Sequence, residues 1–258
     1  YTVLVASFPE HKASLDSMLA VSLSGVDDGP LKLAGMATGM DAGQAILALR
    51  ANDGAFQNPI GMIEPSDVPG VYNVVPPLEF VFAPHWKTMK TFSLLRYDQF
   101  RSGPPPALTS EQYTRDFNEV KELGDINGTN RTADQVFFAK FWYEFSDIGW
   151  NRIARIVSED KKPGLFTTAR MFALMNMAMA DAYTAGWDSK FYHTFWRPYT
   201  ATRPAATDGN DETMPDPDWQ SAEVTPPIHD YPSTHSALGN AAATVLSHSF
   251  GDHTSFTT

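Results

Sequence analysis

The chain has 258 residues, of which 43% are hydrophobic, so it is long enough to bury a sizeable core. Lysine and arginine total 19 against 30 aspartates and glutamates, which gives a formal net charge of −11. This balance argues against a non-specific nucleic-acid binder and against an anionic membrane surface as a partner, because both need a basic face. There is no cysteine, which excludes disulfides and cysteine-ligated metals. The sequence has no run of 18 apolar residues, so we expect no membrane span.

The first 106 residues predict two helices followed by a long loop. Apolar spacing favours a helix over residues 7–23 that ends at Gly25, and Pro30 begins a second helix that runs to Ala51. Residues 55–106 hold nine of the 19 prolines and show no long hydrophobic period. We expect an ordered loop there, with short helical or extended pieces that wrap the helices.

Five more helices are expected in the rest of the chain. Capping boxes predict the first two, with Thr109 and Gln112 opening a helix towards Leu123 and Thr132 and Gln135 opening one through Phe145. The others are expected over residues 150–157, 163–193 and 233–248, with a loop rich in proline and aspartate over 204–230. The longest carries an apolar stripe, made of Met171, Leu174, Met175, Ala178, Ala182 and Ala185.

No convincing strand and no internal repeat are found, so the predicted class is all-α. We expect a helical bundle with long Pro-rich loops, in a single domain over residues 1–258. Asp181 falls on the apolar stripe of the longest helix, and we expect it to pair with a buried donor such as an arginine.

The stretch KFYHTFWRPYTATRP, residues 190–204, places cations among aromatic residues in an acidic chain. Lys190 and Arg197 are seven apart, which is nearly two helical turns, and Pro198 disfavours a helix at Arg197. Two cations that converge in apolar company indicate an anion site, where an arginine fork and a lysine point charge bind oxygen atoms. The alternative is a pair of surface cations whose stems cover the aromatic rings.

A second stretch, HDYPSTHSALGNAAATVL, begins a helix at Ser233 after Pro232. A helix N-terminus offers free N–H groups and the positive end of the helix dipole to an anion. Ser233 adds a hydroxyl, and His235 places an imidazole in the first turn, where it is suited to general acid or base work. The alternative is an ordinary serine N-cap with a histidine in the first turn.

These motifs together resemble a known signature. Lys190, six residues, Arg197-Pro198 and then Pro232-Ser-Thr-His235 resemble the vanadium-dependent haloperoxidase and type 2 phosphatidic acid phosphatase superfamily, closest to its haloperoxidase branch. LALRANDG (47–54) and NGTNRTADQ (127–135) are also similar to that branch. The resemblance implies an enzyme that holds vanadate, with phosphate as the alternative occupant. Its substrates would be hydrogen peroxide and a halide, or a phosphate ester if the chain is an acid phosphatase.

The resemblance also implies roles for individual residues. Lys190 and Arg197 would bind the oxyanion, together with Ser233 and the backbone N–H of Thr234, where the family usually has glycine. His235 would be the acid or base of the reaction. Three further residues would belong to the substrate pocket or its surroundings: Trp187 beside the halide, Ile228 at the halide-tuning position, and His193, which is alternatively a structural histidine.

One motif of the family is missing from the printed sequence. The family has an arginine and, six residues later, the histidine that is the axial ligand or the phosphatase nucleophile. After His235 the sequence has only His248 and His253, and no arginine. We therefore expect the axial histidine beyond residue 258; the alternative is a non-catalytic anion-binding or structural protein. The resemblance implies a secreted or periplasmic location, which the sequons at Asn127 and Asn130 and the unusual N-terminus support.

Overall fold

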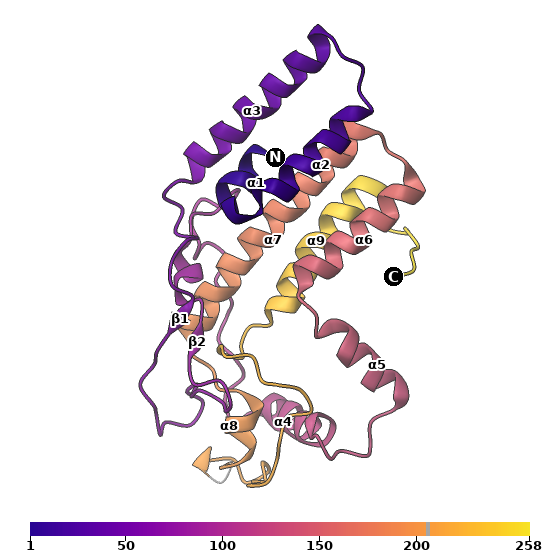
Figure 1. Cartoon of the computed structure of the whole chain (residues 1–258). Helices are drawn as coiled ribbons and strands as arrows, with labels where there is room; N and C mark the ends of the chain where they lie inside the picture. Colours follow the sequence, from indigo (N-terminus) through magenta and orange to yellow (C-terminus); the bar gives the residue numbers. More distant parts are fainter. Residues whose placement is uncertain (205–206) are drawn as a thin grey trace. The chain divides into compact units, whose positions relative to one another are not determined.

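The computed structural model describes residues 1–204 and 207–258 (Figure 1). Its contacts group into two compact units, Tyr1–Asp53 and Gly54–Thr258, while the single domain expected over residues 1–258 stays a prediction. The all-α class is confirmed, because helices dominate the described residues and the only strands among them are two residues long. Within the same residues, no helix combines the length and the apolar character needed to span a bilayer.

The first unit consists of helices joined by short turns. Its elements are α1 (Thr2–Ser7), the 3-10 turn η1 (Pro9–His11), α2 (Lys12–Ser24) and α3 (Pro30–Arg50). Gly25 follows the last residue of α2 and Pro30 is the first of α3, as predicted. The helix expected over residues 7–23 begins only at Lys12. Phe8, which precedes a proline, has non-helical angles (φ −135°, ψ 67°), so the chain cannot run helically through this point.

The second unit begins with the Pro-rich loop, which is ordered as expected. It contains an unpredicted antiparallel pair of two-residue strands, β1 (Ile60–Gly61) and β2 (Val81–Phe82), and the 3-10 helix η2 (Pro84–Thr88). The 3-10 helix η2 packs against the longest helix, α7 (Leu165–His193). The loop therefore covers this helix, as the sequence predicts.

The remaining helices of this unit begin at identifiable caps. They are α4 (Glu111–Gly124), α5 (Ala133–Trp142), α6 (Ser146–Lys161), α8 (Pro198–Thr202) and α9 (Thr234–Phe250). The box formed by Thr132 and Gln135 is present, with both of its hydrogen bonds. The cap of α4 is Ser110 and not Thr109, since the Ser110 hydroxyl accepts the hydrogen bond from the Tyr113 N–H at 3.2 Å. The predicted loop over 204–230 includes residues 205–206, which lie outside the described residues.

One face of α7 packs between α6 and α9 and forms the main core, lined by Ile153, Ala154, Val157, Met171, Met175, Met179, Leu238, Ala242 and Leu246. Met175 is fully buried, whereas Leu174 is 43% exposed, so the prediction for Leu174 is wrong. A helix advances about 100° per residue, which places Leu174 about 60° to one side of Met171 and Met175 about 40° to the other. The buried stripe follows the i, i+4 row and leaves Leu174 at its edge.

Candidate functional site

Lys190 lies in the last turn of α7 and is almost completely buried, with 2% of its surface exposed. Its ammonium Nζ donates hydrogen bonds to the backbone carbonyls of His229 and Asp230, both at 2.7 Å. Burial lowers the pKa of Lys190 to about 7, and the positive charge of Arg197 acts in the same direction. Asp230 offsets part of this effect. The site therefore holds a cation that is poorly compensated by its surroundings.

Arg197 reaches the same segment from a different element. The helix α7 ends because Thr194 adopts left-handed angles (φ 49°), and Arg197 is then the N-cap of α8, directly before Pro198. Its Nε donates to the carbonyl of Ile228 at 2.5 Å, and its Nη1 donates to the Asp230 carboxylate at 2.8 Å. Lys190 and Arg197 therefore converge on residues 228–230, although they do not share a helix.

The residues around this segment carry unsatisfied polar atoms. The His229 ring lies between the rings of Tyr72 and Phe191, with centroids 4.6 Å away in each case. His229 Nδ1 and the Tyr72 hydroxyl are buried and have no hydrogen-bond partner among residues 1–204 and 207–258. Burial lowers the pKa of His229 to about 3, and the nearby charges of Lys190, Arg197 and Lys87 add to the effect. The imidazole is therefore neutral at physiological pH.

The first turn of α9 begins three residues after this segment. Ser233 is the N-cap, and its hydroxyl accepts a hydrogen bond from the Ser236 N–H at 3.3 Å. Thr234 approaches α7 so closely that a Cβ added at Gly186 would lie 2.8 Å from Thr234 Cγ2. The close approach depends on a glycine one helical turn before Lys190, a role that the sequence analysis did not assign to Gly186.

The His235 imidazole points to a different neighbour. Its Nε2 lies 3.1 Å from the backbone carbonyl of Glu144, and the side chain is exposed. Glu144 itself pairs with Arg152 through its carboxylate. The structure thus brings Lys190 and Arg197 together beside the start of α9, but it turns His235 towards the α5–α6 connection.

The residues predicted for a substrate pocket are packed into the protein. Trp187 is 5% exposed, contacts the rings of Trp86 and Tyr183, and donates from Nε1 to the Phe82 carbonyl at 3.3 Å. Ile228 is also 5% exposed, and His193 Nε2 lies 3.0 Å from the Ser102 carbonyl. Their roles beside a substrate stay predictions.

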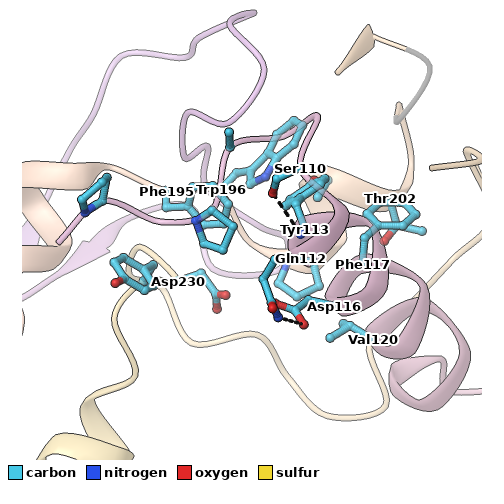
Figure 2. Close-up of a pocket in the computed structure, with 16 residues that line it drawn as sticks. Ser110, Gln112, Tyr113, Asp116, Phe117, Val120, Phe195, Trp196, Thr202 and Asp230 are labelled. Atoms are coloured by element: carbon cyan, nitrogen blue, oxygen red, sulfur yellow. Dashed lines mark hydrogen bonds between the residues drawn. The ribbon is translucent and has the colours of Figure 1, made fainter. Parts of the chain in front are cut away.

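A cavity of about 740 Å³ has Asp230, which both cations contact, in its lining (Figure 2). Residues of α4 form one wall, and residues on either side of Arg197, together with Asp230 and Tyr231, form another. A second cavity of about 480 Å³ lies along α7 and includes Gly186 and Ser189. Neither cavity is lined by Lys190, Arg197, His235 or the three residues predicted for the substrate pocket.

Three contacts tie the Pro-rich loop to α7. Asp181 pairs with hydrogen-bond donors, as expected, but these are backbone N–H groups and not an arginine: its carboxylate accepts from residues 92–94 at 2.6, 2.7 and 3.2 Å. Asp188 binds the Arg101 guanidinium with two hydrogen bonds, at 2.7 and 2.8 Å. The Ser189 hydroxyl accepts from the Ser102 N–H at 3.1 Å. The loop thereby holds the end of α7 that carries Lys190.

The donor set fits a tetrahedral oxyanion chemically. Lys190 has three N–H groups and uses two on carbonyls, while Arg197 has five and uses one on a carbonyl and one on a carboxylate. The groups they bind are all oxygen acceptors, as the oxygens of phosphate or vanadate are. The unsatisfied His229 Nδ1 and Tyr72 hydroxyl add two polar atoms beside the same segment.

Three comparisons show which known proteins the chain is similar to. A profile of the VCPO second helical-bundle domain matches residues 170–258, which include α7, α8 and α9. Over 188 residues the chain is 28% identical to the vanadium chloroperoxidase of Curvularia inaequalis, which covers 60% of this chain. Its fold matches the crystal structure of a bacterial vanadium-dependent iodoperoxidase with a TM-score of 0.76 over 93% of this chain, at 24% sequence identity.

The chain spans only part of each relative, namely 30% of the chloroperoxidase and 59% of the iodoperoxidase chain. The matched profile coincides with the part of the chain that contains Lys190, Arg197 and the start of α9. The chain is therefore similar to vanadium haloperoxidases, in sequence over residues 170–258 and in fold over most of its length.

Proposed function

We propose that the protein is a vanadate-dependent haloperoxidase-like enzyme that oxidises a halide with hydrogen peroxide. The observation that carries the proposal is the convergence of Lys190 and Arg197, from two different elements, on the three residues that lead into α9. Two cations and a helix N-terminus in one place form an electrostatic site for an oxyanion. The secreted or periplasmic location remains part of this proposal.

Each residue of the site would act on the anion through its charge or its N–H groups. Bound vanadate would supply the Lewis-acid centre at which hydrogen peroxide is activated. The Lys190 ammonium would hold its proton next to the anion, because an added negative charge raises a pKa that burial has lowered. Arg197 would orient the oxygens with its planar fork, and the Ser233 hydroxyl and the Thr234 N–H would donate from the helix end.

His235 would serve as the acid or base of the reaction. In this structure its Nε2 is directed to the Glu144 carbonyl, so its use at the anion requires the side chain to rotate from that contact. The exposed position of His235 leaves the side chain accessible for such a change. A histidine suits this work because its ordinary pKa lies near neutrality.

The first prediction concerns Lys190, which we expect to be essential. Replacing it in Lys190→Met removes the charge and keeps much of the side-chain volume in the buried site. We expect vanadate-dependent bromination of an organic dye to fall by about 10² or more, the usual loss when a charge-stabilising donor is removed. The matched control is Lys161→Met, at the exposed C-terminal end of α6, which is expected to keep wild-type activity.

The same preparations distinguish the alternatives. Phosphate-ester hydrolysis in the absence of vanadate, with no bromination in its presence, identifies a phosphatase that uses the same residues. Full activity of Lys190→Met contradicts the proposed site. Absence of both activities in the full-length wild-type protein, with vanadate or phosphate still bound, supports a non-catalytic anion-binding protein.

A further inference from the structure

Arg197 already has a carboxylate partner in this structure. Its Nη1 donates to Asp230 Oδ1 at 2.8 Å, while the arginine side chain is only 13% exposed. A charge-assisted hydrogen bond in a partly buried place is stronger than one at the surface. One N–H group of the guanidinium that is proposed to bind an oxyanion is therefore already bound to the Asp230 carboxylate.

Asp230 is held by both cations. Its backbone carbonyl accepts from Lys190 Nζ at 2.7 Å, and its carboxylate accepts from Arg197. The other acceptors of Lys190 and Arg197 are the backbone carbonyls of the preceding residues, His229 and Ile228. The acceptor oxygens of this short segment thus occupy the positions around the two cations that the oxygens of a bound anion would need.

The carboxylate of Asp230 is also accessible from solution. Its side chain is 38% exposed, and the residue lines the cavity of about 740 Å³. Figure 2 shows Asp230 on one side of this cavity, with Tyr113 and Phe117 of α4 on the other. Asp230, and not Arg197, is the member of this ion pair that lines the cavity, so an anion in the cavity lies beside the carboxylate.

We infer that Asp230 is a further residue of the anion site and that its carboxylate weakens oxyanion binding by competing for Arg197. This inference rests on the oxyanion site proposed above. Arg197 is the cation that Asp230 neutralises directly, through the hydrogen bond between the carboxylate and Nη1. A phosphate or vanadate ion that binds beside Asp230 must therefore displace its oxygen from Arg197 and overcome the repulsion between like charges.

The test is to measure the affinity of inorganic phosphate and of orthovanadate by titration calorimetry. Asp230→Asn keeps the shape and removes the charge, and we expect both anions to bind about tenfold to a hundredfold more tightly, as for loss of one competing charge-assisted hydrogen bond. Asp230→Glu keeps the charge, so it is expected to bind no more tightly than the wild type. Asp218→Asn, an exposed position in the same loop, is the control for net charge.

The outcomes separate this inference from the proposed function. If the wild type binds and Asp230→Asn binds equally or more weakly, the inference is overturned and the oxyanion site stands. If neither protein binds either anion, the oxyanion site fails and the inference fails with it. Tighter binding by Asp218→Asn of the same size also overturns the inference, because the effect would then be due to net charge alone. The thermal unfolding of each variant confirms that it is folded.

Discussion

At the scale of single residues, the site contains basic groups that are buried near one another. Lys190 and His229 both have lowered pKa values, and in each case burial is the first cause and neighbouring positive charge the second. The protein gains nothing in stability from such groups, since their charged forms are more costly in the folded state than in water. Ionisable groups with shifted pKa values concentrate at functional sites, which agrees with an anion site here.

His229 gives a prediction for stability against pH. Its folded pKa of about 3 lies below the ordinary value of 6.5, so between these values only the unfolded chain binds the proton. The free energy of unfolding therefore falls as the pH drops through this window. Between pH 6.5 and 5.5 we expect the wild type to lose about 1 kcal/mol more than His229→Phe, as measured by urea denaturation.

The control for this measurement is His253→Phe, which removes an exposed imidazole outside the cluster. The control is expected to follow the wild type across the same pH range. Equal losses in the wild type and in His229→Phe would show that His229 takes up its proton in the folded protein, contrary to the burial seen here.

At the scale of elements, the contact between α7 and α9 places the two halves of the signature next to each other. Lys190 comes from the end of α7, and Ser233 and Thr234 come from the start of α9. The helices pack along the core, and Gly186 of α7 lies close to Thr234 of α9. A glycine in a helix interior costs about 1 kcal/mol relative to alanine, so its presence here is explained by this close approach.

Gly186→Ala tests that explanation. The new Cβ would lie 2.8 Å from Thr234 Cγ2, too close for a normal contact, so the helices must separate or the threonine must move. We expect the free energy of unfolding to fall by about 1–3 kcal/mol, because the overpacking outweighs the better helix propensity of alanine. Chemical denaturation measures the change.

A second substitution, Thr234→Ser, is expected to relieve the clash, because it removes the methyl group Cγ2 that the new Cβ would contact. In the Thr234→Ser background, Gly186→Ala is expected to be neutral or stabilising by up to about 1 kcal/mol, as helix propensity predicts. Gly103→Ala, at a loop glycine with open space around it, is the control. An equal loss in both backgrounds would exclude Thr234 as the cause.

At the scale of the whole molecule, the core between α6, α7 and α9 holds the second unit together. Met175 is fully buried there, and the neighbouring Leu174 is 43% exposed. We expect Met175→Ala to lower the free energy of unfolding by about 2–5 kcal/mol, because it leaves a cavity in a packed core. Leu174→Ala is the matched control, and we expect a loss below about 1 kcal/mol. Similar losses in the two variants would contradict the orientation of α7.

Most helices were predictable because their signals are local. Pro30 and Gly25 mark helix ends, and the Thr132–Gln135 box closes within four residues, so the printed sequence contains all that is needed. The incorrect helix starts also have local causes. The helix α2 begins later than predicted because Phe8, which precedes a proline, is not helical, and the N-cap of α4 is Ser110 and not Thr109. Leu174 was misassigned because apolar spacing alone does not fix the centre of the buried face.

The amino-acid sequence was enough to predict the all-α class and, through the motifs around Lys190, Arg197 and His235, the resemblance to vanadium haloperoxidases. The acceptors that the two cations bind, and the contact of His235 with Glu144, are seen only in the folded chain. The donors to Asp181 are likewise seen only there: they are backbone N–H groups 87 to 89 residues away in the sequence. The physical reason is range: caps and helix periods act between close neighbours, whereas pairing across such separations depends on how the helices and the Pro-rich loop pack.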